Sequence, residues 1–329
     1  MDRTGERHGK EDSNGIPESG DILDFSDGKL DWCNHGGITR KKTLQIGNTA
    51  NMVKIPDRTR NPESCHKSRF SPFSEYVGCH IYGSLGIPVQ KTYLGKYDDH
   101  GQKVVAVACR DFQNDDIQLY PMQYIHPADP FAPSFHGKLT LSSLSARISN
   151  LEDKPLEQQA ADRYWSMTVV DYLIGNSSRS LEDWGMAAGN TGQLFPAPVY
   201  DCGRSLLAEA SDEELDRVMR EGVFANKCLD VQTALFDETT RNRMTFGELL
   251  KDPCPDLQRA ILEIVPRIDL DVIRRIIRNT PFMPDIRRRA MMESIRVRYE
   301  QVLLPVYETL RSVNRDAQCH SSADGGRWG

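Results

Sequence analysis

A lysine inside an apolar stretch is the first residue of this sequence whose position suggests chemistry. Lys54 follows Met52-Val53 and precedes Ile55. An ammonium group in such surroundings must pair with an anion or extend along the apolar surface until it reaches water. Lys54 is therefore a candidate anion ligand, and its alternative is a hydrated lysine on the solvent face of a strand.

Two further features could serve an anionic ligand. Gly36-Gly37 precedes Lys41-Lys42, and a glycine pair lets backbone N–H groups approach an anion closely. Glu75 lies near the start of a predicted helix, where an acid can pair with a lysine or simply stabilise the helix N-terminus. A ligand-free glycine turn and an acid that serves only its own helix remain the alternatives.

The elements that must position these residues are short in the first half of the chain. Alternation over 43–46 and the apolar run 52–55 predict a hairpin. Apolar residues at every fourth position predict a helix over 72–85, with Ser71 as its N-cap and Gly86 at its end. Two more strands are expected over 89–97 and 103–110.

The second half of the sequence has helical periodicity. Amphipathic helices are expected over 156–174, 270–277 and 291–310, with a turn-rich segment over 175–205. The prediction is an α+β chain with a β-rich N-terminal lobe at 32–125 and a helical C-terminal lobe at 126–313. The acidic N-terminal end at 1–31 and the C-terminal end at 314–329, both with few apolar residues, are expected to be disordered.

Composition narrows the function classes. The chain has 329 residues, and 41 Lys and Arg against 47 Asp and Glu give a net charge of −6, which argues against direct nucleic-acid binding. No run approaches the ~18 apolar residues of a membrane span, and no signal peptide is visible. We expect a cytoplasmic protein without a membrane partner. An arginine-rich stretch at 267–298 is interpreted as a solvated helix face, with nucleic-acid contact as the alternative.

Short motifs in a fixed order resemble the HipA-like serine/threonine kinases, including the compact bacterial form without the long N-terminal extension of the toxin HipA. The resemblance runs from Gly36 to Tyr299 and implies a two-lobed, protein-kinase-like fold with the nucleotide between the lobes. Its most specific stretches are Gly36-Gly37 with Lys41-Lys42, Met52-Val53-Lys54, Ser74-Glu75-Tyr76, Leu85 to Val89, Asp171 to Asn176, Trp184-Gly185, Ala197 to Gly203 and Val265 to Asp269.

The resemblance also implies a role for individual residues. Gly36 and Gly37 would lie in the phosphate loop, and Lys54, supported by Glu75, would bind the phosphates of ATP. The hinge at 107–112 would meet adenine, and Asp111 is assigned to nucleotide binding with it. Asp201, the acid of an Asp-x-Gly turn, would hold Mg²⁺. ATP and Mg²⁺ are the implied cofactors.

The chain departs from the family pattern in the catalytic loop. After Ile-Gly-Asn the pattern is x-Asp-Arg-His-x-x-Asn-Trp/Phe-Gly, and here the loop reads Ser177 to Gly185. Ser178 stands at the place of the catalytic aspartate and Ser180 at that of the histidine. Asp183 stands at the place of the metal-binding asparagine, where a carboxylate can still ligate Mg²⁺.

These changes predict a protein that retains nucleotide better than it retains catalysis. A serine hydroxyl is no general base at neutral pH, and losing a general base typically costs ~10²–10⁴-fold in rate. We therefore expect a pseudokinase or a strongly impaired Ser/Thr kinase. The alternatives are an active Ser/Thr kinase of the HipA toxin type, with Glu182 or Asp183 as substitute proton acceptor, and a nucleotidyl transferase using the same pocket. The resemblance implies a protein substrate or an antitoxin-like partner.

Overall fold

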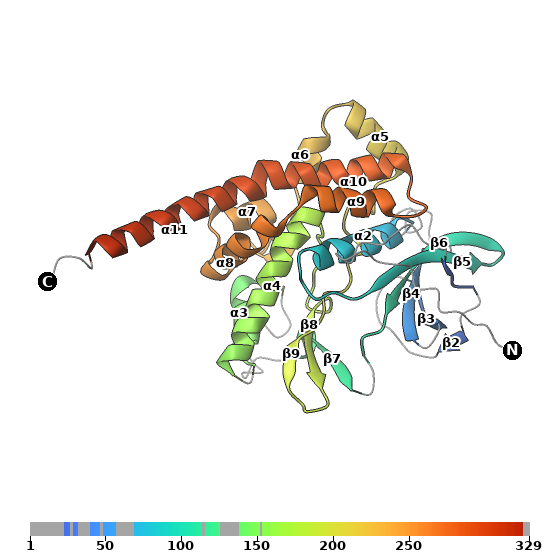
Figure 1. Cartoon of the computed structure of the whole chain (residues 1–329), viewed down its shortest axis with the longest axis horizontal. Helices are drawn as coiled ribbons and strands as arrows, with labels where there is room; N and C mark the ends of the chain where they lie inside the picture. Colours follow the sequence, from blue (N-terminus) through green and yellow to red (C-terminus); the bar gives the residue numbers. More distant parts are fainter. Residues whose placement is uncertain are drawn as a thin grey trace.

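A computed structural model describes residues 23–26, 29–31, 40–46, 49–56, 69–113, 116–125, 138–151 and 153–324. Within these ranges one end of the molecule is a β-sheet and the other is built of helices (Figure 1). This is the α+β, two-lobed arrangement that the sequence predicts.

A six-stranded sheet forms the first lobe, in the order β1-β5-β6-β4-β3-β2. Neighbouring strands are antiparallel except for β1 and β5, which run parallel. The predicted hairpin is confirmed as β3 paired with β4, with Lys41 opposite Lys54. The strands are β1 (Leu23–Asp24), β2 (Lys29–Asp31), β3 (Arg40–Ile46), β4 (Thr49–Ile55), β5 (Thr92–Asp99) and β6 (Gln102–Arg110).

Helix α2 (Ser71–Ser84) lies between the sheet and the helical lobe (Figure 1). It begins one residue earlier than predicted, and Phe70 holds the N-cap position without a side-chain hydrogen bond, so the assignment of Ser71 as N-cap is wrong. Pro72 in the first turn supplies the start signal instead, because proline there sacrifices no helical hydrogen bond. The helix ends as predicted, with Gly86 at φ +75°.

The helical lobe is arranged around α4 (Lys154–Ile174), whose N-cap Asp153 accepts a hydrogen bond from the Leu156 backbone N–H at 2.8 Å. Gly175 ends α4 at φ +69°, and a Cβ there would lie 2.6 Å from Nη2 of Arg298. The guanidinium of Arg298 in turn donates to the carbonyl oxygens of Leu173 and Cys228. The C-terminal end of α4 is thereby joined to a helix much later in the chain.

The other helices and the small two-stranded sheet of this lobe are η1 (Met122–Tyr124), α3 (Leu141–Ile148), α5 (Asp212–Arg220), α6 (Phe224–Leu229), β10 (Gln232–Phe236), β11 (Arg243–Thr245), α7 (Phe246–Lys251), α8 (Pro255–Ile264), η3 (Val265–Arg267), α9 (Leu270–Asn279), α10 (Asp285–Arg298), the π-helical turn η4 (Tyr299–Leu303) and α11 (Leu304–Asp324). Of these elements, α8, α10 and α3 pack against α4, and α5, α6 and α9 pack against α10. Figure 1 shows α10 and α11 as one long rod across the lobe.

The segment predicted as turn-rich, 175–205, contains two strands that the sequence does not indicate. β8 (Gly185–Gly189) and β9 (Leu194–Pro196) form a three-stranded sheet with β7 (Ile117–Pro121). The sequence Gly-Met-Ala-Ala-Gly of β8 has neither alternation nor β-branched residues, which are the usual signals of a strand. Its order comes from pairing with β7, a partner far away in sequence.

The structure also differs at both ends that were expected to be disordered. Strand β1 pairs with β5, and Phe25 beside it is 1% exposed among side chains of the sheet. At the other end α11 continues to Asp324, past the predicted boundary at residue 314. No helix among the described residues combines the length and apolarity needed to cross a bilayer.

Candidate functional site

A buried lysine bridges two carboxylates where the sheet, α2 and a turn of the helical lobe meet. The Lys54 ammonium nitrogen lies 2.6 Å from Glu75 Oε2 and 3.0 Å from Asp201 Oδ1. The side chains of Lys54 and Glu75 are 5% and 0% exposed, whereas Asp201 is 37% exposed. The open alternatives for Lys54 and Glu75 are thereby decided, since neither a solvent-facing lysine nor a capping acid would be buried in a pair.

Glu75 also holds the turn that carries Asp201. Its second oxygen, Oε1, accepts the backbone N–H of Cys202 at 3.1 Å. A Cβ at Gly203 would lie 2.6 Å from Ser71 Oγ and 2.9 Å from Glu75 Oε2, so a glycine is required for this close approach. Asp201 itself adopts φ +58°, a conformation that residues other than glycine rarely hold without support from their surroundings.

Lys54 and Asp201 stabilise each other's charged forms. Burial disfavours the charged form of Lys54, but the Asp201 and Glu75 carboxylates raise its pKa well above the ordinary value. Burial likewise opposes ionisation of Asp201, and the Lys54 ammonium outweighs it and lowers the pKa of Asp201 to about 2. At neutral pH the site therefore presents a fixed ammonium and a fixed carboxylate to whatever binds beside them.

Beside this group lies a cavity of about 320 Å³. Lys54, Asp201, Asp183, Glu182 and Asp111 all contribute to its lining, together with Lys41, Met52, Gln90, Phe112, Gln113, Leu119, Pro121, Gln123, Tyr124 and Tyr200. The lining residues therefore come from the sheet, from the segment after β6, from the loop at 182–183 and from the turn at 200–201.

Two polar side chains of the cavity lining, Gln90 and Asp111, differ in whether the protein uses their acceptor oxygens. The buried Oε1 of Gln90 has no hydrogen-bond partner within the described ranges, although Nε2 of the same side chain donates to the Arg110 carbonyl oxygen at 3.0 Å. Such an acceptor is costly unless a ligand or a water satisfies it. Asp111, in contrast, uses Oδ1 to accept the backbone N–H of Gln113 and so shapes its own loop.

Asp183 is the second carboxylate of the cavity that a cation could use. Burial and the nearby charge of Asp201 raise its pKa, against the hydrogen bonds that it accepts from the Ser180 N–H at 2.9 Å and hydroxyl at 2.7 Å. Mg²⁺ is usually held by one or two carboxylates together with substrate phosphates, so this pair fits that ion. Among the described residues, no cluster of three or more metal-ligating side chains is present.

The catalytic loop rests on a buried ionic network that sequence reasoning missed. The Arg179 guanidinium donates to both oxygens of Asp171, at 2.9 and 3.0 Å, and the two side chains are 6% and 2% exposed. The Tyr82 hydroxyl and the Asn176 amide also donate to Asp171, at 2.8 and 2.9 Å. An aspartate within the apolar run Val169 to Ile174 was the available signal, because such a group must be fully paired.

Arg179 extends this network to the cavity. It donates to the backbone carbonyl oxygens of Asp183 and of Tyr200, the residue before Asp201, and so it holds the backbone at two of the carboxylates that line the cavity. Its pKa is raised well above the ordinary value, because the Asp171 charge outweighs the burial that disfavours a cation.

Ser178 makes its hydrogen bonds within the loop. Its hydroxyl donates to Oδ1 of Asn176 at 2.9 Å, and its backbone N–H points at the same oxygen at 3.3 Å. Ser178 does not contribute to the cavity lining, unlike Asp183 a few residues later. Of the other residues singled out from the sequence, Lys54, Glu75 and Asp201 meet, Asp111 and Asp183 line the cavity, and Gly36 and Gly37 lie outside the described residues.

Comparison with known proteins gives a consistent picture. No model of a known protein family matches the chain. The Helicobacter pylori serine/threonine-protein kinase CtkA is 30% identical over 277 residues, which are 82% of each chain. A crystal structure of the H. pylori proinflammatory kinase CtkA matches with a TM-score of 0.78 at 26% identity, covering 89% of this chain and all of that one. Shewanella oneidensis HipA, from a complex with HipB and operator DNA, gives a TM-score of 0.48 at 12% identity over 84% of this chain and 67% of its own.

The relationship to CtkA extends over most of both sequences. The α+β fold with its sheet lobe and helical lobe agrees with it. The chain therefore belongs to the HipA-like serine/threonine kinase family.

Proposed function

We propose that this protein binds ATP with Mg²⁺ between its two lobes and is a pseudokinase or a strongly impaired Ser/Thr kinase. The single observation that supports binding is the buried Lys54 between Glu75 and Asp201, open to a cavity of about 320 Å³. A fixed ammonium at the edge of a polar cavity is suited to phosphate oxygens.

The lining residues divide between the parts of the nucleotide. Lys54 and Lys41 lie opposite each other on paired strands and would face the phosphates, with Gly36-Gly37 as the proposed phosphate loop. Gln90 has a free acceptor, and Asp111 and Phe112 form the segment proposed to meet adenine. Asp201 and Asp183 would hold Mg²⁺, which when bound neutralises charge on the phosphate oxygens.

Catalysis is proposed to be weak because the position of the general base holds a hydroxyl. The Ser178 Oγ–H is already donated to Asn176, and a neutral serine cannot take the proton of a substrate hydroxyl. From a kinase range of roughly 1–100 s⁻¹, a loss of ~10²–10⁴-fold would leave slow turnover at best.

The second candidate is an active Ser/Thr kinase, and one observation favours it. Glu182 lines the cavity near Asp183, so a carboxylate is available as a substitute acceptor. Phosphoryl transfer also depends mostly on positioning and electrostatics, which limits the work of the base. A nucleotidyl transferase would use the same residues with the α-phosphorus as the site of attack and pyrophosphate as the leaving group.

Binding is tested by the unfolding midpoint of the purified chain with and without ATP and Mg²⁺. A ligand at ~100 times its dissociation constant stabilises by about 2.7 kcal/mol, and Asp201→Asn should lose the Mg²⁺-dependent part of the shift. No shift with any nucleotide would contradict the proposal.

Chemistry is tested with ATP labelled at the γ- or the α-phosphate. A pseudokinase transfers neither label at ordinary rates, a kinase transfers only the γ-label with release of ADP, and a nucleotidyl transferase transfers only the α-label with release of pyrophosphate. Ordinary kinase rates with the γ-label in the native chain would overturn the pseudokinase proposal.

A protein partner belongs to the same proposal. Because the relative CtkA is named a serine/threonine-protein kinase, we propose a protein substrate or an antitoxin-like regulatory protein as the partner of this chain. A pull-down with the ATP-loaded protein, compared with the Asp201→Asn variant, tests whether a bound partner depends on the nucleotide site.

A further inference from the structure

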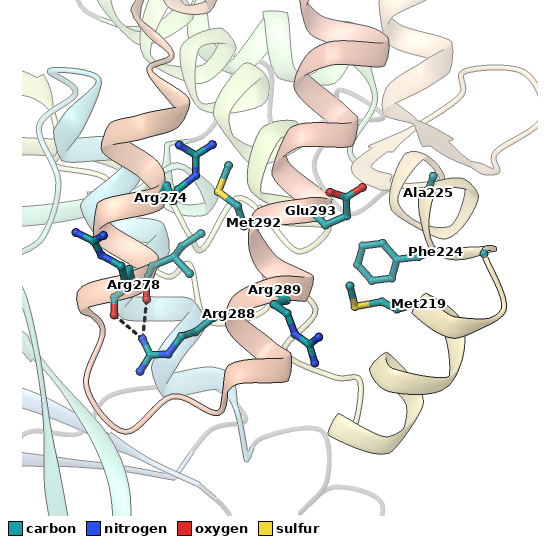
Figure 2. A pocket seen from close by; sticks show the side chains of 11 residues that line it. Met219, Phe224, Ala225, Arg274, Arg278, Arg288, Arg289, Met292 and Glu293 are labelled. Atoms are coloured by element: carbon teal, nitrogen blue, oxygen red, sulfur yellow. Dashed lines mark hydrogen bonds between the residues drawn. The ribbon is translucent and has the colours of Figure 1, made fainter.

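A second and larger cavity, of about 620 Å³, opens on the helical lobe. Its walls come from α9 and α10 on one side and from α5, α6 and the turn between them on the other (Figure 2). It shares no lining residue with the cavity beside Lys54. We call it the arginine pocket, lined by Met219, Gly222, Phe224, Ala225, Arg274, Ile277, Arg278, Arg288, Arg289, Met292 and Glu293.

The floor of the arginine pocket is apolar and adaptable. Phe224 and Ile277 are 6% and 2% exposed and form its base. Met219 and Met292 are half-buried, Met219 next to Phe224 and Met292 toward Arg274 (Figure 2). Methionine is unbranched and polarisable and can repack around incoming apolar groups, so this floor suits a large apolar side chain.

The rim of the pocket is positively charged, whereas the whole chain has a net negative charge. Four arginines and one glutamate line the pocket, in a chain whose net charge is −6. The glutamate, Glu293, is already paired with Arg296 at 2.7 Å. The local excess therefore belongs to the arginines.

The four arginines differ in the ion pairs and hydrogen bonds that they make within the protein. Arg274 pairs with Asp271, and Arg288 donates to the carbonyl oxygens of Ile277 and Arg278. Within the described ranges, no carboxylate pairs with Arg278 or Arg289, and both side chains are exposed. Two guanidinium groups with unused donors thus flank an apolar floor.

We propose that the arginine pocket binds an acidic peptide segment of a partner protein. One large apolar side chain of the peptide would lie on the apolar floor, and its carboxylates would pair with Arg278 and Arg289. Guanidinium groups bind carboxylates in a bidentate manner, and charged rims set specificity and association rate. A peptide fits better than a nucleic acid, because the floor is apolar and concave and carries methionine where base or backbone contacts would need polar groups.

The test uses a fluorescein-labelled nonapeptide of alternating glutamate and leucine, titrated with the full chain in the absence of nucleotide. Binding should weaken as salt rises. The double charge reversal Arg278→Glu with Arg289→Glu should raise the dissociation constant at least about tenfold, equivalent to ~1.4 kcal/mol. Met292→Ser should weaken binding with the charges left intact.

The matched control is Arg217→Glu with Arg311→Glu, two exposed arginines outside the pocket whose reversal changes the net charge equally. It should bind the peptide as the native chain does. The proposal is overturned if both double variants bind alike, if a lysine–leucine nonapeptide binds equally well, or if no binding is measured. Tighter binding of a single-stranded oligonucleotide, or of dodecyl phosphate without the peptide, would overturn it in favour of those ligands. Because nucleotide is absent, failure here is separate from failure of the ATP proposal.

Discussion

The Lys54 centre and the loop at 176–183 are both built on buried charge, and they differ in the side chain at the position to which the family resemblance assigns chemistry. Around Lys54 the ammonium has both carboxylate partners in place. In the loop the scaffold of Arg179 and Asp171 is equally complete, while Ser178 offers only a hydroxyl that is bonded to its neighbour.

The difference teaches that the buried ionic framework of a loop can be complete whatever side chain stands at a neighbouring, less buried position of the loop. Arg179, paired with Asp171, holds the backbone carbonyl groups of Asp183 and Tyr200, and so it supports Asp183 and Asp201 of the cavity beside Lys54 as well as the loop. Removing such a buried ion would leave its partner unpaired, which is strongly destabilising. A substitution at Ser178, whose hydroxyl donates a hydrogen bond to Asn176, removes no such buried ion pair.

The largest expected effect comes from restoring the loop. Ser178→Asp, combined with Ser180→His and Asp183→Asn, should raise transfer of the γ-label from ATP by ~10²–10⁴-fold, because it supplies the missing proton acceptor. The control is Ser177→Asp with the same two other changes, which adds the charge one residue away. Equal gains in both triple variants, or no gain in the first, would show that Ser178 is not what limits the rate.

The next effect is on the intact centre. Lys54→Met should lower the free energy of unfolding by about 3–5 kcal/mol, because it leaves the buried Glu75 charge without its partner. It should also abolish binding of a fluorescent ATP analogue. Lys103→Met removes an exposed pair with Asp24 and should cost only ~0–1 kcal/mol. Chemical denaturation measures both, and similar costs would contradict the importance given to burial.

A smaller effect is expected where the two regions share a support. Tyr82→Phe removes the hydroxyl that donates to Asp171 from α2. A hydrogen bond to a charged group is worth about 1.5–3 kcal/mol, and the loss should appear as faster amide exchange in the loop at 176–183. Tyr76→Phe, in the same helix, is the comparison, and equal exchange in the two variants would argue against the proposed support.

The smallest expected effect is a difference between Asp201 and Asp183 in how the stability that each contributes depends on pH. The pKa of Asp201 is lowered to about 2, so it contributes stability above its ordinary pKa of 3.8, and this is lost as pH falls from there towards 2. The pKa of Asp183 is raised, so its charge destabilises the fold at neutral pH, and stability is regained as it protonates above pH 3.8.

Unfolding free energies of Asp201→Asn and Asp183→Asn, measured between pH 7 and pH 3, check these signs. We expect the first variant to be less stable than the native chain at neutral pH and the second to be more stable, with both differences shrinking in acid. Changes of the same sign in both variants would refute the assignment.

Local patterns in the sequence were sufficient for the lysine hairpin, α2 and α4. Lys54 in an apolar run and the four-residue spacing around Glu75 each indicated their element directly. The pairing of the two side chains followed from the family resemblance rather than from the pattern, because nothing local specifies which strand faces which helix.

Features that depend on distant contacts could not be predicted in this way. Strand β8 pairs on one side with β7, which comes from a distant part of the sequence, and on the other side with β9. The aspartate of α4 is satisfied by Tyr82 and Arg179, which come from other elements. The arginine-rich stretch was interpreted as a solvated helix face, and the apolar floor below it became visible only with α5 and α6 in place.

The guanidinium of Arg298 occupies the space that a side chain at Gly175 would need. A larger residue at 175 would displace this guanidinium and break its hydrogen bonds to the carbonyl oxygens of Leu173 and Cys228. Because Gly175 also adopts φ +69°, a larger residue there is strained whatever stands at position 298, so we expect glycine to be kept at 175 even where 298 varies.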